Sequence, residues 1–142
     1  MNFKIQPVKS LKDVSQLIRL HNIVWENSTG IIDLLENSTL CNLLFEEKSG
    51  NLAGYLFIED DTEKDFGEIN DIVVDPKYRK MGCGKMLMTN AMKHYKTLKL
   101  NADAGNKELI SFYQNSGFIQ EAVIENYYAI DRDAMRLVWH KT

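Results

Sequence analysis

Residues 66–92 hold the feature that most limits how this chain can fold: an apolar segment, a proline, and two glycines at the start of a helical pattern. The segment FGEINDIVVD predicts a β-strand that ends at Pro76. The residues RKMGCG follow at 79–84, and KMLMTNAMKHY then places its apolar residues with a helical period. A helix that only has to begin needs one capping residue, so two glycines indicate that something lies against this backbone.

A strand, a tight loop and a helix start in this order can bind an anion. The first N–H groups of a helix have no partner inside it, and the helix dipole favours negative charge there. Gly82 and Gly84 would let a phosphate approach these amides, while Arg79, Lys80 and Lys85 add positive charge. The alternative is that the glycines are ordinary turn residues.

Two known phosphate loops are excluded by spacing. A P-loop needs a glycine where Arg79 stands and a Ser or Thr where Met86 stands. The dinucleotide fingerprint needs a third glycine where Leu87 stands.

The remaining periodicities predict a mixed sheet flanked by helices, an α/β fold of the α+β type rather than a doubly wound one. Ser10 and Asp13 form a capping box ahead of a first helix, Asn106 is the N-cap of a late helix, and Gly117 ends it. The predicted order is β-α-(α)-β-β-β-α-β-α-β-β, with strands at 3–8, 40–46, 52–59, 66–75, 98–104, 118–126 and 133–140.

Length and composition limit the functional classes. A chain of 142 residues is most economically one domain, spanning 1–142. The net charge of −3 argues against a nucleic-acid partner, and no apolar run is long enough to cross a membrane. The start lacks the apolar part of a signal peptide, so we expect a cytoplasmic protein with Cys41 and Cys83 reduced. His94 and His140 lack metal-ligand spacing, so we expect no metal site.

Three segments together resemble the GNAT superfamily of N-acetyltransferases. RKMGCG resembles the family's Q/R-x-x-G-x-G/A acetyl-coenzyme A motif, and INDIVVDPKYR resembles its fourth strand and following loop. NKELISFYQNSGF resembles the N-x-x-A-x-x-F-Y-x-x-x-G-F segment that follows the fifth strand. The likeness is strong over 66–118, and the first sixty residues match only in element order.

The resemblance implies that acetyl-CoA is the co-substrate. The pyrophosphate would lie on the amides of residues 80–85, and the pantetheine arm would run along β-strand residues 72–74 like an added strand. This requires the fourth and fifth strands to part. Asn106 would contact the cofactor near the thioester. The implied cofactor-binding residues are Ile72, Val73, Val74, Arg79, Lys80, Met81, Gly82, Cys83, Gly84, Lys85 and Asn106.

The resemblance also implies the catalytic groups. Tyr113 stands where the family often has the acid that protonates the departing thiolate, and Glu68 stands where its histone acetyltransferases carry a glutamate base. Without the family, Tyr113 reads as a core tyrosine and Glu68 as a solvated residue after an acidic loop. Strand alternation turns Asp71 to the face opposite Glu68, where it could be structural. A backbone N–H near Val73 would meet the charge that develops on the carbonyl oxygen.

The sequence says least about the identity of the acceptor amine. The closing segment ENYYAIDRDAMRLVW resembles the hairpin of ribosomal-protein N-terminal acetyltransferases, which would assign Tyr127 and Tyr128 to a peptide N-terminus. First helices of the family border the acceptor site, so Trp25, at the end of the first predicted helix, is added to the residues expected to bind the acceptor. His21 lies on the apolar side of the same helix, and we interpret it as a core residue. That subgroup has a glutamate where Asn101 stands, so a small-molecule amine such as a polyamine stays open. A non-catalytic acyl-CoA-binding domain is a further alternative, and many relatives pair, so a homodimer is possible.

Overall fold

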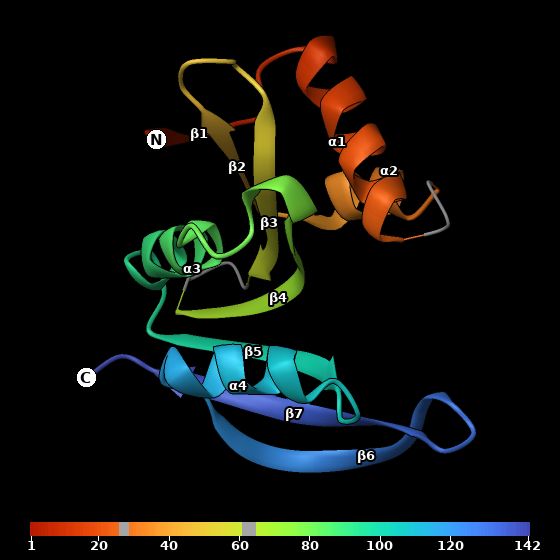
Figure 1. The fold of residues 1–142 in the computed structure, drawn as a ribbon. Helices are drawn as coiled ribbons and strands as arrows, with labels where there is room; N and C mark the ends of the chain where they lie inside the picture. The colour runs from red at the N-terminus through yellow and green to blue at the C-terminus, as the bar shows by residue number, and fades with distance from the viewer. Residues whose placement is uncertain (26–28, 61–64) are drawn as a thin grey trace.

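A computed structural model of the chain describes residues 1–25, 29–60 and 65–142 (Figure 1). The acidic loop predicted before Glu68 falls largely on residues 61–64, which lie outside the described residues. The element order is the predicted one, with one additional short helix, η1. The elements are β1 (Phe3–Pro7), α1 (Leu11–Val24), α2 (Thr29–Asn37), β2 (Leu40–Glu46), β3 (Leu52–Asp60), β4 (Phe66–Val74), η1 (Pro76–Tyr78), α3 (Cys83–Met92), β5 (Thr97–Asp103), α4 (Lys107–Asn115), β6 (Ile119–Ala129) and β7 (Arg132–His140).

The strands form one seven-stranded sheet in the order β1-β2-β3-β4-β5-β7-β6. All neighbours are antiparallel except β4 and β5, which are parallel, so the predicted mixed sheet is confirmed. Strand β6 extends to Ala129, three residues beyond the prediction, and therefore includes Tyr127 and Tyr128.

Helices cover both faces of the sheet (Figure 1). Helices α3 and α4 bury one apolar cluster against β3, β4, β5 and β7. Helices α1 and α2 bury a second cluster that reaches only β2, β3 and β4. On the α1 side the sheet is therefore apolar under the helices, and it turns polar where β5 and β7 begin. No helix in the described part of the chain is long and apolar enough to cross a membrane.

Local signals account for the helix ends. The Ser10 side chain accepts a hydrogen bond from Asp13 N at 3.2 Å, and Asp13 Oδ2 accepts one from Lys9 N at 2.9 Å, which confirms the cap predicted there. Asn106 Oδ1 accepts from Leu109 N at 3.2 Å and caps α4 as predicted. Gly117 follows α4 with a φ of 103°, a conformation that favours glycine.

The only parallel ladder in the described sheet is short. Strand β4 pairs with β5 at Phe66–Thr97, Gly67–Leu98 and Glu68–Lys99. From Ile69 onward β4 has no pairing with β5, although its pairing with β3 continues to Val74. The second half of β4 therefore has one edge that no strand of the described chain occupies.

Candidate active site

The loop between β4 and α3 presents a run of unpaired backbone amides. Lys80 and Gly82 both have positive φ, at 64° and 80°, and Gly82 is the N-cap of α3. The first amide of the helix that finds a backbone acceptor is Met86 N, which donates to Gly82 O at 2.9 Å. Within the described part of the chain, the N–H groups of residues 80–85 have no hydrogen-bond acceptor. Six consecutive donors at a helix N-terminus are suited to a phosphate.

The two glycines of this loop serve different purposes. A Cβ at Gly82 would meet nothing within 4 Å, so the surface is open there and the positive φ explains the glycine. A Cβ at Gly84 would lie 3.1 Å from the Phe112 ring of α4. The space that a Cβ would take is therefore open at Gly82 and filled by α4 at Gly84, and the phosphate contact of both glycines stays a prediction.

The charges around the loop are exposed. The side chains of Arg79, Lys80 and Lys85 all lie at the surface, and Arg79 Nε donates to Val74 O at 3.4 Å. Cys83, between the glycines, is buried, and burial raises the pKa of its thiol. A buried neutral thiol is a poor nucleophile.

The free edge of β4 is made by Ile72 and Val74. Asp75 N donates to Ala53 O at 2.8 Å, which makes these two residues a hydrogen-bonded antiparallel pair. Alternation along the ladder then turns the N–H and C=O of Val73 toward β3 and those of Ile72 and Val74 away from it. The backbone groups that a ligand could pair with are thus those of Ile72 and Val74, of which Val74 O also accepts the hydrogen bond from Arg79 Nε. A donor for developing negative charge belongs at Ile72 rather than at Val73.

Glu68 is held by an arginine that the sequence analysis did not single out. Arg136 of β7 donates from Nη2 to Glu68 Oε1 at 2.7 Å and from Nη1 to Glu68 Oε2 at 2.5 Å. Its Nη1 also donates to Asn101 Oδ1 at 3.1 Å. The hydrogen bond to Glu68 raises the pKa of Arg136. Leu100 and Leu137 belong to the α3 cluster, so their strand neighbours Asn101 and Arg136 point to the α1 face.

A β-bulge changes the side-chain alternation in the middle of β4. The β3–β4 register passes from Phe57–Asp71 to Ile58–Ile69, which leaves Asn70 as an extra residue. An extra residue in one strand turns every side chain beyond it to the sheet face opposite the one that simple alternation predicts. Asp71 therefore does not point to the face that the sequence pattern predicts.

Glu68 and Asp71 lie on the same face of the sheet, and the prediction that they face opposite ways is wrong. Glu68 meets Arg136 on the α1 face, while Asp71 accepts a hydrogen bond from Tyr55 Oη, in the cluster beneath α1, at 2.9 Å. A single strand thus brings two carboxylates to the border between the helix-covered and the open part of this face.

Asp71 belongs to a hydrogen-bonded chain that reaches into α1. His21 Nδ1 lies 2.9 Å from Tyr55 Oη. The only Tyr55 hydroxyl proton is donated to Asp71, so His21 must be the donor to Tyr55. Burial raises the pKa of Asp71, whereas hydrogen bonds from Tyr55 and Trp25 and the charge of His21 lower it. His21 is buried, which confirms its prediction as a core residue.

Tyr113 lies on the buried side of α4. Its side chain is 4% exposed, and its hydroxyl has no hydrogen-bond partner among the described residues. The pKa of Tyr113 is raised by burial first, and then by the negative charges of Asp71 and Tyr128. Tyr113 is thus within electrostatic range of Asp71 and Tyr128, although its ring packs in the cluster beneath α3 and α4.

The aromatic residues predicted for the acceptor are exposed at the surface. Trp25 is half exposed at the end of α1, beside Asp71. Tyr127 and Tyr128 are partly exposed, with ring centroids 4.9 Å apart. Tyr128 also stacks with Arg132, whose guanidinium lies 5.6 Å from its ring centroid. Asn106 is exposed at the start of α4, and its side-chain oxygen is engaged in the cap.

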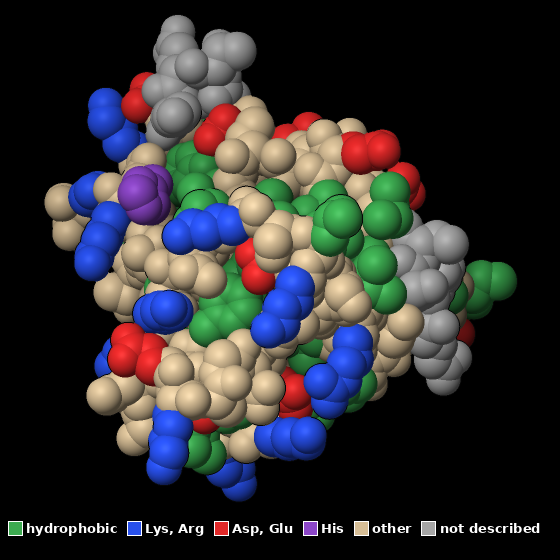
Figure 2. All heavy atoms as spheres, turned by 90° about the horizontal axis from the view of Figure 1, so that it is seen from above, with side chains coloured by type: hydrophobic (Ala, Val, Ile, Leu, Met, Phe, Trp, Pro, Cys, Tyr) green, Lys and Arg blue, Asp and Glu red, His purple; other side chains and the backbone are tan. Residues whose placement is uncertain are grey.

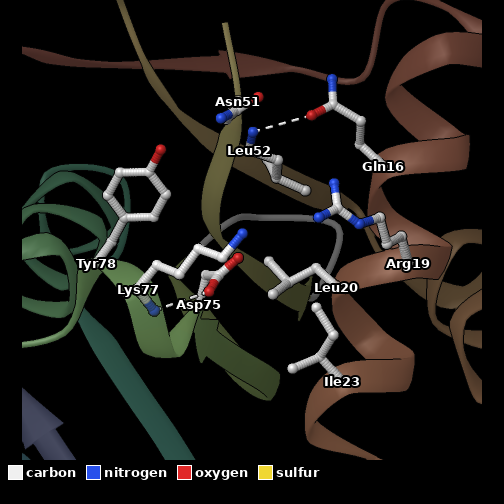
Figure 3. Close-up of a pocket in the computed structure, with 9 residues that line it drawn as sticks. All are labelled: Gln16, Arg19, Leu20, Ile23, Asn51, Leu52, Asp75, Lys77 and Tyr78. Atoms are coloured by element: carbon white, nitrogen blue, oxygen red, sulfur yellow. Dashed lines mark hydrogen bonds between the residues drawn. The ribbon is translucent and has the colours of Figure 1, made fainter. Parts of the chain in front are cut away.

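A surface pocket elsewhere does not compete with this site. It lies between α1, the β2–β3 turn and η1, lined by Gln16, Arg19, Leu20, Ile23, Asn51, Leu52, Asp75, Lys77 and Tyr78 (Figure 3). Its volume of about 20 Å³ holds little more than one water molecule. Seen from above, the end of the molecule that carries the β2–β3 turn shows many Lys and Arg side chains around a hydrophobic area (Figure 2).

Sequence reasoning missed Arg136, Tyr55 and Asn70 as determinants of the site. Arg136 is a charged residue between Met135 and Leu137 in the predicted last strand. A charge among apolar strand residues is the only sequence signal that could have drawn attention to it. Tyr55 lies in an apolar strand with no distinguishing neighbour. The bulge at Asn70 did have a signal in the sequence, because the alternation of polar and apolar residues breaks where Asn70 and Asp71 stand together.

Comparison with solved structures finds the same fold in acetyltransferases. The ribosomal-protein-S18-alanine N-acetyltransferase from Escherichia coli superposes with a TM-score of 0.81 at 21% identity, covering 98% of this chain and 94% of that one. The NatC complex bound to Gag peptide and CoA gives 0.82 at 19% identity, covering all of both chains. Ard1 from Thermoplasma volcanium gives 0.78 at 21% identity, covering 99% and 98%. At these identities the likeness shows the fold alone.

Comparison with curated protein sequences gave no significant match. The sequence profile of the acetyltransferase (GNAT) family, in contrast, matches residues 12–118, which include β4, the amide-rich loop, α3, β5 and α4. The match extends over most of the chain and contains all three segments that carry the resemblance. The chain therefore belongs to the GNAT acetyltransferase family.

Proposed function

We propose that residues 1–142 form one catalytic domain that transfers the acetyl group of acetyl-CoA to a primary amine, by direct attack within a ternary complex. The observation that carries the proposal is the run of unpaired amides at residues 80–85 beside the unoccupied edge of β4. The first is suited to a pyrophosphate and the second to the amide groups of a pantetheine arm.

The chain's own residues would then act as follows. The amides of 80–85, with the charges of Arg79, Lys80 and Lys85, hold the phosphates, and Met81 and Cys83 contribute backbone only. Ile72 and Val74 pair with the pantetheine arm, and the Ile72 N–H lies on the side where the thioester oxygen develops charge. Val73 supports this edge through its pairing with β3. Holding amine and thioester together supplies most of the rate.

Tyr113 is the proposed acid. Its ring is buried, and its hydroxyl has no partner among the described residues although it is not one of the fully buried atoms. Burial raises its pKa further above neutrality, so the hydroxyl holds its proton. These are the properties of a group that gives a proton to a departing thiolate. Glu68 as the base stays a prediction, and the bidentate contact with Arg136 weighs against it, since both carboxylate oxygens already accept hydrogen bonds.

For the acceptor we propose a peptide N-terminus. One structure of the same fold is a ribosomal-protein-S18-alanine N-acetyltransferase, and another is bound to a peptide and CoA. Trp25, Tyr127 and Tyr128 are exposed aromatic side chains suited to contact with a peptide. The carboxylate that such enzymes carry at the Asn101 position has a neighbour here in Glu68, which shares Arg136 with Asn101. A polyamine remains the second candidate, favoured by the carboxylates Glu68 and Asp71 on one face.

Calorimetric titration of acetyl-CoA tests the cofactor site. Wild-type protein is expected to bind, and Gly82→Glu is expected to abolish binding, because the side chain enters the open phosphate space and repels the charge. Gly82→Ala is the matched control: nothing lies within 4 Å of its Cβ, so it carries only the strain of the positive φ, about 1 kcal/mol.

Equal loss in Gly82→Ala and Gly82→Glu, or no binding to folded wild-type protein, would contradict the phosphate site. Binding followed by acetylation in a panel of peptides and polyamines would identify the acceptor class. Binding without turnover on any amine would favour the non-catalytic alternative.

A further inference from the structure

The proton that the acceptor must lose has a better destination in this site than Glu68. A primary ammonium cannot attack a thioester until it has given up a proton, and α-amino groups are largely protonated at neutral pH, with a reference pKa of about 7.7–8.0. Any proton transferred to Glu68 would break a hydrogen bond with Arg136 at 2.5 or 2.7 Å. The pair is better suited to tying β4 to β7 than to proton transfer.

We propose that Asp71 accepts this proton, and that Tyr55 and His21 are positioning residues that hold its carboxylate. The inference rests on the proposed acetyl transfer and assigns to Asp71 a role that the family resemblance implied for Glu68. The bulge at Asn70 makes it possible, because it turns Asp71 onto the α1 face beside the free edge of β4.

The position of Asp71 fits the task. Its backbone precedes Ile72, whose groups form the free edge of β4, so the carboxylate lies next to the place proposed for the thioester. Its side chain is 11% exposed, which leaves access for an amine or one water molecule. Tyr55 Oη and His21 Nδ1 approach the same oxygen, Oδ2, at 2.9 and 3.8 Å. Their approach fixes the carboxylate from the buried side.

The charged and titratable groups around Asp71 come from every element packed on it. His21 faces it from α1 and Tyr55 from β3, and Trp25 at the end of α1 donates a hydrogen bond to it. Tyr113 of α4 is within electrostatic range, and the Glu68–Arg136 pair lies on the same sheet face. Burial raises the pKa of Asp71 above that of an exposed carboxyl group, and this brings it closer to the pH at which a base is most useful.

The proposed step balances in protons and bonds. An N–H bond of the ammonium breaks and its proton moves to the Asp71 carboxylate, directly or through one water. The amine lone pair forms a bond to the thioester carbonyl carbon, and the carbon–sulfur bond breaks. Tyr113 gives its hydroxyl proton to the thiolate and regains one from the nitrogen of the new amide, while Asp71 releases its proton to solvent. The sum is one amide, one thiol and one proton.

The test compares Asp71→Asn with wild-type protein over pH 6–10, using an accepted peptide. Near pH 7 the variant is expected to lose about 10²-fold or more in kcat/KM, the usual contribution of a positioned base. Above the pKa of the amine the substrate arrives deprotonated, so the ratio of the two rates should shrink to a few-fold by pH 9.5. A residue that only supports the structure would lower the rate by the same factor at every pH.

Two further variants keep the test decisive. Glu68→Gln should lower kcat/KM by a factor that does not change with pH. Tyr55→Phe keeps the buried ring but removes a hydrogen bond to the charged carboxylate, so the acid limb of the pH–rate profile should move to higher pH. This second variant also serves if Asp71→Asn fails to fold.

A constant ratio for Asp71→Asn, a pH-dependent defect in Glu68→Gln instead, or an unmoved acid limb in Tyr55→Phe would overturn the assignment while leaving acetyl transfer in place. A wild-type protein that binds acetyl-CoA but acetylates no amine would overturn the proposed function and the assignment together.

Discussion

At the scale of single residues, Tyr113 shows how a core position can also be a reactive one. It lies on the buried side of α4, in contact with Phe112 and Phe118, with ring centroids 5.4 and 5.7 Å away. Its hydroxyl has no partner among the described residues and is not one of the fully buried unsatisfied atoms, so a ligand can reach it. The unpaired hydroxyl is therefore the observation that favours the acid role.

Tyr113→Phe should lower kcat by about 10²-fold while the dissociation constant for acetyl-CoA stays within about twofold. Because no hydrogen bond of the described residues is lost, the melting temperature should not fall. Steady-state kinetics, calorimetry and thermal unfolding check these three points. Loss of stability with unchanged kcat would instead identify Tyr113 as a structural residue.

At the scale of secondary structure elements, the start of α4 combines two predicted roles in Asn106. Its Oδ1 caps the helix by accepting from Leu109 N, and its exposed amide nitrogen is left for the cofactor contact that the resemblance implies. The two roles use different atoms, so a substitution can separate them.

Asn106→Asp keeps the capping oxygen and removes the donor, so it should weaken acetyl-CoA binding several-fold with little change in stability. Asn106→Ala should also lose the cap, at about 1 kcal/mol in the free energy of unfolding. Chemical denaturation and calorimetry on both variants measure the difference. If Asn106→Asp binds acetyl-CoA as tightly as the wild type, Asn106 is only a cap.

At the scale of the whole molecule, two parts of the sheet are joined by the three-residue ladder between β4 and β5. A cofactor on the free edge of β4 would extend the hydrogen bonding of the sheet. Binding should therefore stabilise the fold as a whole and slow hydrogen exchange where β4 lacks a partner strand.

Acetyl-CoA at 100 times its dissociation constant should stabilise the protein by about 2.7 kcal/mol. The amides of Ile72 and Val74, together with those of residues 80–85, should exchange more slowly, as measured by NMR or mass spectrometry. Gly82→Glu should show neither effect. Protection confined to residues 80–85 would mean that the cofactor does not run along β4.

Much of this protein was determined by local sequence. Element order, the caps at Ser10 and Asn106, the glycine at 117 and the loop at 79–84 follow from propensity, capping and backbone freedom, which act over a few residues. The family resemblance rested on the same local patterns. The homodimer and the cytoplasmic location remain predictions.

The tertiary structure alone decided which side chains meet. Sequence alternation placed Asp71 opposite Glu68, and a single extra residue at Asn70 brought them to one face. Arg136 reaches Glu68 across 68 positions of chain, and Tyr55 reaches His21 across 34. Local patterns specify the period of a strand, whereas a bulge and a contact between distant strands depend on register and packing. Which residue can act as the base of this site therefore depends on the tertiary structure, because register and packing determine which side chains meet.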